Sequence, residues 1–330
     1  MMAAELWLQF VLALDATIRM STPLILCAMA GIFSERSGII DISLEGKMLL
    51  SAFAAASLAA LTGSAMIGLA GAIIISVLFS LLHGFACITH KGNQVVSGLA
   101  INILASGLTV TIGFAIFSQG GQTPFLSRDQ RFLPLELPFT ETIETLPVIG
   151  PSIGVIYSEV ISGHNILVWL AFLAVIVTGY VLFRTTFGLR LRAVGEKPEA
   201  VDTAGISVSW MRYKAVILAG ILCGMAGAYL SIAHGGGFVR EMTAGKGYIA
   251  LAAMIFGNWR PVPVLLACLM FGFLEAIAAR LQGVDLPLIG QVSTDLILVL
   301  PYVLTVILLA GFVGRAIPPR AIGVPYVKER

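Results

Sequence analysis

The sequence predicts an all-α polytopic membrane protein with about ten transmembrane helices, arranged as two inverted repeats that contain broken helices. Three observations carry this prediction: the composition, several long stretches without charged residues, and similar segments that recur in the same order in both halves. Of the 330 residues, 58% are hydrophobic and 12% are charged, whereas an ordinary soluble domain has about 45–50% apolar and about 25% charged residues. This composition and a net charge of only +2 exclude a soluble enzyme, a disordered chain and a nucleic-acid-binding protein.

The predicted spanning helices are runs of about 20 apolar residues, the length that crosses a hydrocarbon layer of about 30 Å at about 1.5 Å per residue. Residues 48–90 contain no Asp, Glu, Lys or Arg and are long enough for two helices with a turn at residues 62–64. Residues 261–281 predict a further span despite Glu275 and Arg280, and residues 247–259 predict a short, broken helix. The remaining predicted spans are residues 94–117, 165–183, 215–233 and 296–314.

The opening segment, residues 6–33, is expected to form two short crossings that meet near residues 19–23. Its apolar run is not preceded by a basic residue, since Arg19 is the first, and we therefore expect mature structure rather than a signal peptide. Two crossings here bring the total to ten and place both termini on the same side of the membrane.

Basic residues set the predicted orientation, because they favour the cytoplasmic side of a membrane. Residues 184–214 are rich in Arg and Lys, and the chain after residue 314 is also basic, so we expect both segments and both termini in the cytoplasm. Residues 119–163 contain several prolines and more acidic than basic residues, so we expect them outside.

Repeated sequence defines the expected domain organisation. LCAMAG at residues 26–31 recurs as LCGMAG at 222–227, EGKMLL at 45–50 is echoed by AGKGYI at 244–249, and QVVS at 94–97 by QVST at 291–294. We expect a single transmembrane domain over residues 1–330, with repeat one at about 20–118, a periplasmic segment at 119–163, a cytoplasmic coupling segment at 184–214 and repeat two at about 215–314. An odd number of crossings between the copies inverts one relative to the other, a topology that transport proteins use.

Interruptions are expected at matching positions of the two repeats. Residues 34–47 and 235–246 combine glycine, polar and charged residues between apolar runs. They predict broken helices whose backbone groups are satisfied by protein or by a water-filled cavity. Ordinary surface loops are the alternative interpretation.

Two polar side chains within apolar runs each have two interpretations. Glu275 could line a water-filled path, because an ionised carboxylate inside a membrane needs a partner or water, or it could form an ion pair with Arg280. Asn102 could bind a substrate or form a hydrogen bond between helices.

Motifs of catalysis and cofactor binding are absent from the sequence. It contains no GxxxxGK[ST], HExxH or GxSxG motif, its four histidines are scattered, and its four cysteines form no CxxC pair. We therefore expect no catalytic residue, no metal site and no cofactor in this chain. Core positions are expected for Cys27, Cys87, Cys223 and Cys268.

The coupling segment is expected to contain two short helices, at residues 190–194 and 199–205. Pro198 is typical of a helix start and Gly205 of a helix end. Such helices would suit docking of a partner, and a solvated loop held to lipid headgroups by its basic residues is the alternative.

Several segments resemble the permeases of bacterial ABC importers for simple sugars and nucleosides, over nearly the whole chain. Glu199-Ala200-Val201, followed after three residues by Gly205, is similar to the EAA loop by which importer permeases engage their ATPases. Residues 38–46, GIIDISLEG, resemble the IDLSVG segment of ribose-type permeases, and residues 243–248, TAGKGY, resemble their AGxGY segment. Residues 31–38, GIFSERSG, are closer to the shorter of the two permeases of the nucleoside branch.

The resemblance implies a permease subunit, not an enzyme, of an importer in the bacterial cytoplasmic membrane that carries a nucleoside. The implied partners are a cytoplasmic ATPase that binds ATP and Mg²⁺, a second homologous permease in a heterodimer, and a periplasmic or lipid-anchored substrate-binding protein. Nucleic acid is not an expected partner. A simple sugar is the alternative substrate, and an ion-coupled carrier that uses Glu275 is the alternative mechanism.

Two sets of functional residues are expected from these arguments. The ATPase-coupling set is Arg190, Arg192, Glu199, Ala200 and Gly205. The translocation-path set is Phe33, Glu35, Asp41, Asn102, Gly245 and Glu275.

Overall fold

The computed structural model describes residues 2–135, 137–138, 154–281, 285–286, 290–291, 299, 303 and 316–328. Its long helices are α1 (Met2–Arg36), α2 (Leu44–Thr62), α3 (Ala65–Gly84), α4 (Gln94–Phe117), α6 (Ile166–Arg184), α9 (Val208–Ala228) and α11 (Pro261–Leu281). The shorter ones are α7 (Thr186–Glu196), α8 (Pro198–Thr203) and α10 (Lys246–Phe256), with single turns η1 (Phe85–Thr89), η2 (Arg128–Gln130), η4 (Tyr157–Ile161) and η5 (Tyr229–His234). Two short antiparallel strands are β1 (Asp285–Leu286) and β2 (Gly290–Gln291).

Within the described residues, 7 helices are long and apolar enough to cross a membrane. The two helices predicted within residues 48–90 are α2 and α3, and Gly63 joins them at a φ of 76°, donating its N–H to Ala59 O. The short helix predicted at residues 247–259 is α10, which spans 11 residues. The predicted span at 296–314 and most of the third sequence echo lie outside the described residues.

The opening segment differs from its prediction, because α1 is one continuous helix of 35 residues that passes through Pro23. A proline has no N–H, so it deprives the carbonyl four residues earlier, that of Arg19, of its helical partner. The Tyr229 hydroxyl donates a hydrogen bond of 3.0 Å to that carbonyl. The predicted pair of short crossings is therefore wrong, because a tertiary contact satisfies the group that the proline leaves free.

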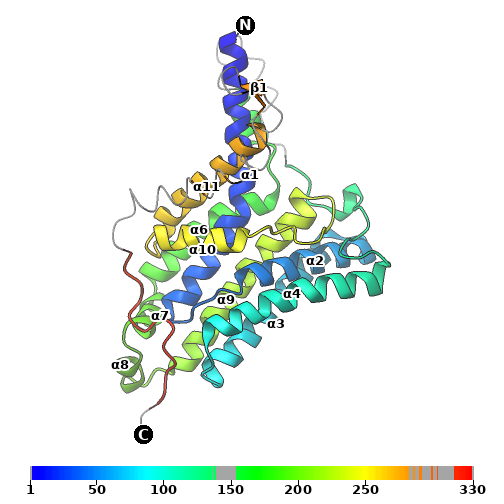
Figure 1. The fold of residues 1–330 in the computed structure, drawn as a ribbon. Helices are drawn as coiled ribbons and strands as arrows, with labels where there is room; N and C mark the ends of the chain where they lie inside the picture. The colour runs from blue at the N-terminus through cyan, green and yellow to red at the C-terminus, as the bar shows by residue number, and fades with distance from the viewer. Residues whose placement is uncertain are drawn as a thin grey trace.

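The two ends of the described chain lie apart. Figure 1 shows the amino-terminal end of α1 at the top and the carboxy-terminal residues at the bottom, near α7 and α8. The side of the membrane on which each terminus lies stays a prediction.

Helices α1 and α9 form the centre of the packing. They contact each other, and the side chains of Cys27 on α1 and Cys223 on α9 are fully buried. Cys223 Sγ donates to Leu44 O of α2 at 3.3 Å. Helix α1 also packs against α10 and α11, and α9 packs against α2 and α3. Figure 1 shows α11 running beside α1. The four cysteines are buried, as the sequence predicts.

The two central helices come close to their neighbours through glycines. A Cβ on Gly31 of α1 would lie 2.9 Å from Met254 Sδ of α10, and a Cβ on Gly227 of α9 would lie 2.3 Å from Met48 O of α2. Gly31 thus lets α1 touch α10, and Gly227 lets α9 touch α2. Helices α2 and α10 are the two that follow the predicted interruptions.

We predict that Tyr229→Phe lowers the free energy of unfolding by about 0.5–1.5 kcal/mol, because it removes the hydrogen-bond donor that Arg19 O has in place of the missing helical N–H. Reversible unfolding in mixed micelles with SDS measures this loss. In a Pro23→Ala background, the restored N–H of residue 23 should reduce the effect of Tyr229→Phe to below about 0.5 kcal/mol. Equal losses in the two backgrounds would contradict this account of the proline.

Candidate functional site

The coupling segment folds as the two short helices α7 and α8 before α9 begins. Thr185 Oγ1 accepts the N–H of Gly188 at the start of α7, and Pro198 occupies the first turn of α8. Gly205 has a φ of 77° and donates its N–H to Asp202 O at 2.9 Å, which ends α8. The predicted start at Pro198 and end at Gly205 are confirmed, and a side chain other than glycine would be strained at Gly205.

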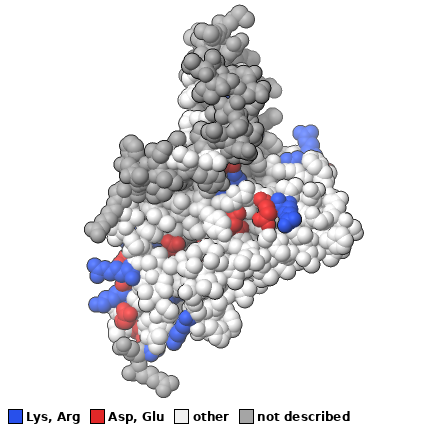
Figure 2. Space-filling model, in the orientation of Figure 1, with Lys and Arg blue, Asp and Glu red and all other residues white. Residues whose placement is uncertain are grey.

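Four residues of the predicted coupling set lie on the surface. Arg190, Glu199, Ala200 and Gly205 are exposed. Arg192 is half-buried, and its guanidinium lies 4.9 Å from the centroid of the Phe183 ring. Figure 2 shows basic and acidic side chains gathered at the lower left of the molecule, where Figure 1 places α7. The first four residues are therefore accessible to a partner, whereas Arg192 also packs within the chain.

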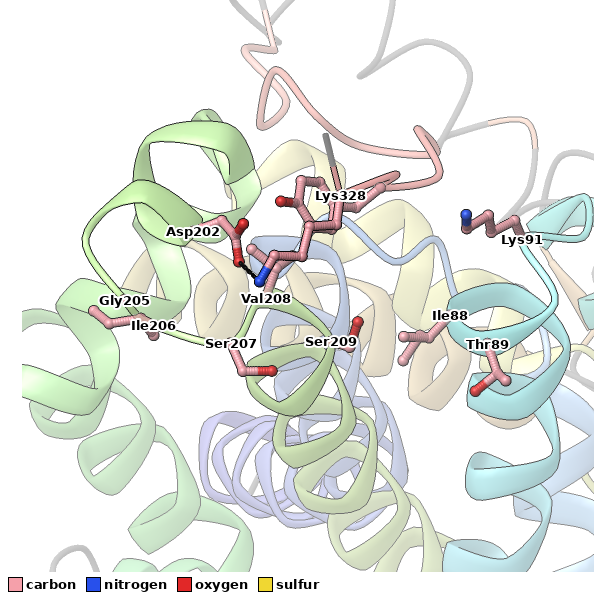
Figure 3. A pocket seen from close by; sticks show the side chains of 11 residues that line it. Ile88, Thr89, Lys91, Asp202, Gly205, Ile206, Ser207, Val208, Ser209 and Lys328 are labelled. Carbon is pink, nitrogen blue, oxygen red and sulfur yellow. Dashed lines mark ion pairs between the residues drawn. The ribbon is translucent and has the colours of Figure 1, made fainter. Parts of the chain in front are cut away.

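A cavity of about 470 Å³ lies beside α8. It lies between the start of α9, the turn η1 and the carboxy-terminal residues. The residues that line the cavity are Ile88, Thr89, Lys91, Asp202, Gly205, Ile206, Ser207, Val208, Ser209, Tyr326 and Lys328. Figure 3 shows Lys328 reaching toward Asp202 from the carboxy-terminal segment, and Lys328 Nζ lies 3.7 Å from Asp202 Oδ1.

The coupling segment touches the end of α1 directly. A Cβ on Gly195, near the end of α7, would lie 2.2 Å from Arg36 O, so only glycine permits this approach. The Arg36 guanidinium donates to the carbonyls of Asn258, at 3.3 Å, and Trp259, at 3.1 Å, just after α10. A displacement of α7 would therefore be passed to the ends of both α1 and α10.

The carboxy-terminal residues fasten the same region. Ala321 donates its N–H to Gly195 O at 2.8 Å, and Gly323 donates to Gly38 O at 3.0 Å. Arg212 of α9, which is buried, donates from Nη1 to Val324 O and from Nε to Ser37 O, both at 3.2 Å. This segment thus ties α7, α9 and the connection between α1 and α2 together.

The starts of α2 and α10 form the second candidate site. The Glu45 carboxylate, in the first turn of α2, accepts the N–H of Gly245 at 2.8 Å and that of Gly247 at 2.6 Å. Asn102 of α4 accepts the N–H of Gly46 at 2.8 Å and donates to Ile42 O at 3.0 Å. Side chains of repeat one therefore satisfy backbone donors at the start of both helices.

A buried ion pair holds the connection between α1 and α2. Lys47 Nζ lies 2.5 Å from Asp41 Oδ2, both side chains are fully buried, and the Ser43 hydroxyl donates to Asp41 at 2.6 Å. Burial by itself raises the pKa of Asp41, but Lys47 and His83 outweigh it and hold that pKa below its ordinary value. The ionised pair therefore contributes stability above about pH 4, the ordinary aspartate pKa, and loses it as the pH falls through the lower folded value.

The predicted path residues separate into two groups in the structure. Phe33, Glu35 and Asp41 are buried, and the Glu35 carboxylate accepts the Trp259 Nε1–H at 2.7 Å. Asn102 and Gly245 are half-buried and lie around the starts of α2 and α10. The role of all these residues in a path stays a prediction, but only the second group is accessible.

Glu275 has a partner other than the predicted one. It pairs with Lys246 at the start of α10, and the two side chains are 33% and 13% exposed. Arg280 instead donates from Nη1 to Gln9 O at 3.1 Å. The interpretation as a Glu275–Arg280 ion pair is wrong, because the packing of α10 on α11 brings Lys246 closer.

Sequence reasoning missed Ser106, Glu241 and Tyr248. Ser106 Oγ donates to the Glu241 carboxylate, and Asn102 Nδ2 donates to Tyr248 Oη at 2.8 Å. The two partners lie 135 positions apart in the first contact and 146 positions apart in the second. Spacing along the chain therefore gave no signal for either contact. Among the described residues, no group of three His, Cys, Asp or Glu side chains is arranged to hold a metal ion.

Comparison with known proteins identifies the family. Residues 13–313 match the family described as the branched-chain amino acid transport system / permease component. The chain belongs to this family of transport permeases. The resemblance to permeases noted in the sequence is thereby confirmed, and this chain is a permease component of a transport system rather than an enzyme.

Individual relatives cover nearly the full length of this permease. It is 38% identical to the guanosine ABC transporter permease protein NupQ of Bacillus subtilis, over 96% of each chain. It is also 38% identical to the nucleoside ABC transporter permease protein NupC of Lactococcus lactis, over 94% of this chain and 95% of that one. The L-arabinose ABC transporter permease protein AraH of Azospirillum brasilense is more distant, at 24% identity over 62% of this chain and 52% of that one.

We predict that Lys47→Met destabilises the permease by about 3–5 kcal/mol, because it leaves the Asp41 carboxylate buried without its cation. The double variant Asp41→Asn/Lys47→Met should recover most of this loss. Thermal unfolding of the detergent-solubilised protein measures both variants.

Lys246→Met is the matched control, since Lys246 is the repeat-related lysine and its partner Glu275 is partly solvated. It should cost less than about half of the loss caused by Lys47→Met, because the carboxylate that it leaves is 33% exposed and that of Asp41 is fully buried. An equal loss of stability for Lys47→Met and Lys246→Met would contradict the importance of the buried pair.

Proposed function

We propose that this permease forms the membrane path of an ABC importer for nucleosides. Support comes from the two relatives at 38% identity over nearly the whole chain, whose names describe guanosine and nucleoside permeases. In this importer an ATPase in the cytoplasm binds ATP and Mg²⁺, and a periplasmic or lipid-anchored binding protein delivers the nucleoside. A second homologous permease completes the path.

The ATPase docks on α8 and its flanks. The exposure of Glu199, Ala200 and Gly205, and the contact of α7 with the end of α1, support this assignment. Closure of the ATPase moves α7, and the movement reaches α10 through the bonds of Arg36 to residues 258 and 259. The movement driven by ATP hydrolysis thereby reaches both α1 and α10.

The two halves act as inverted repeats. Three features of the packing support this arrangement. Helices α1 and α9, which carry Cys27 and Cys223 at equivalent positions of the sequence echo, pack against each other. Helix α1 packs on α10 and α11, and α9 packs equivalently on α2 and α3. Repeats related in this way can exchange which side of the membrane is open. The 7 described spans, the shorter helix α10 and the predicted span at residues 296–314 together give nine crossings.

The coupling segment faces the cytoplasm in this proposal, and the first residues of α1 and residues 119–163 face the periplasm. The six basic residues Arg184, Arg190, Arg192, Lys197, Arg212 and Lys214 support the orientation. With α1 as a single crossing, the carboxy-terminal residues are cytoplasmic and the amino-terminal end of α1 is not.

Uptake of radiolabelled guanosine tests the function in cells that lack this permease and carry it on a plasmid. We expect uptake that requires the permease, persists when the ion gradients are dissipated with ATP maintained, and is inhibited by unlabelled nucleosides. Inhibition by pentoses alone would favour a sugar importer, and loss of uptake with the ion gradient would favour an ion-coupled carrier.

We predict that Gly205→Arg lowers uptake at least about tenfold at an unchanged membrane level. The positive φ costs about 1–3 kcal/mol for a side chain with a Cβ, and the arginine projects into the docking surface. Gly205→Asn is the matched control, because asparagine tolerates this conformation, and it should retain more than about half of the uptake. A Gly205→Arg permease that assembles with its ATPase and transports at the normal rate would show that the docking assignment is wrong.

A further inference from the structure

Helix α4 has a mostly apolar outer face, and two polar residues, Asn102 and Ser106, lie one helical turn apart at its edge. The apolar side chains on it include Val96, Ile103 and Phe114, which are 63%, 76% and 63% exposed. Asn102 and Ser106 are half-buried at the edge of this face. Apolar residues on α4 fit contact with lipid or with another membrane subunit, whereas the polar pair needs a different explanation.

Residues of the second half complete a polar cluster around this pair. Ser106 Oγ donates a hydrogen bond to the Glu241 carboxylate, and Asn102 Nδ2 donates one of 2.8 Å to Tyr248 Oη. Glu241 and Tyr248 are exposed, and Tyr248 keeps 44% of its surface open. We name these four residues, Asn102, Ser106, Glu241 and Tyr248, the polar window.

The polar window lies near the middle of the membrane. Helix α4 has 24 residues, and Ser106 lies about midway along it, so it is roughly 18 Å from either end at about 1.5 Å per residue. The hydrocarbon layer is about 30 Å thick. An exposed carboxylate bonded to Ser106 is therefore far from both membrane surfaces.

A carboxylate at that depth cannot face hydrocarbon without a large cost, so water must reach it. Tyr248 belongs to α10, and the Lys246–Glu275 pair at the start of that helix is also partly exposed. Figure 2 shows acidic and basic side chains near the middle of the drawn face, apart from those at its lower left. The face with the polar window therefore borders an aqueous space.

The backbone before α10 is strained beside the polar window. Glu241 has a φ of 54° and Ala244 a φ of 46°, in the left-handed region that residues with a Cβ rarely adopt. Residues in such costly conformations concentrate at functional sites. This backbone conformation brings Glu241 beside Ser106 and leads the chain into α10.

We propose that the polar window is the wall of the translocation path that contacts the nucleoside in transit. The Tyr248 ring offers a face on which a base stacks, a contact that every nucleobase can make because each has a π-face. Ser106 uses one acceptor position of the Glu241 carboxylate, and a carboxylate has about four, so the others can accept ribose hydroxyls or base amino groups. This inference rests on the proposed nucleoside function.

Cysteine labelling during transport tests the proposal on the complete importer in membrane vesicles. The native cysteines are all buried, so the wild-type permease should label weakly with a charged, membrane-impermeant maleimide. Tyr248→Cys, Glu241→Cys and the small change Ser106→Cys should label, and guanosine should slow their labelling at least about threefold. Ile103→Cys is the control, because its more exposed side chain on the same helix should contact lipid or protein and stay unlabelled.

Two outcomes would overturn the proposal. Window cysteines that stay unlabelled in an importer that still takes up guanosine would show that the cluster does not face water. Window cysteines that label without any protection by guanosine would show that the nucleoside does not pass there. Failure of the proposed function is distinguishable, because the wild-type importer would then show no guanosine uptake at all.

Substitution of Tyr248 provides a second measurement. Tyr248→Phe keeps the ring but breaks the bond to Asn102, whereas Tyr248→Leu removes the ring. Maximal guanosine uptake with saturating binding protein should fall less than about threefold in the first and at least about tenfold in the second. Equal losses in the two variants would indicate a purely structural role for the hydroxyl and contradict stacking.

Discussion

Helices α2 and α10 begin inside the protein and α1 passes through a proline, so each leaves backbone groups without a partner in their own helix. Such groups cost several kcal/mol in an apolar surrounding unless they are bonded. The Glu45 carboxylate binds the start of α10, Asn102 binds the start of α2, and Tyr229 binds the free carbonyl of α1. The packing of the whole permease has to keep these three side chains in place.

The same contacts connect the coupling segment to the centre. Glu45 of repeat one holds α10 of repeat two, and Arg36 at the end of α1 holds the other end of α10. Helix α10 is therefore bonded to the first half at both ends, and α7 lies against Arg36. A short helix held in this way can tilt without breaking its own hydrogen bonds, which suits a permease driven from one side.

Local sequence signals were reliable where the local chemistry decided the structure. Pro198 and Gly205 mark the start and end of α8, and the turn between α2 and α3 lies at Gly63, because proline and glycine restrict or extend the backbone whatever surrounds them. The proline rule failed at Pro23, since the hydroxyl that compensates it comes from a residue 210 positions away. The partner of Glu275 was missed for the same reason.

The sequence by itself determined that this chain crosses a membrane many times and which permease family it belongs to, because apolar length and short motifs are local properties. Only the tertiary structure decided that α1 is one helix, that Lys246 pairs with Glu275, that Ser106 bonds to Glu241 and that Asn102 bonds to Tyr248. Those facts depend on which helices pack together. Apolar helices of similar composition leave that choice to side-chain shape and to a few buried polar groups.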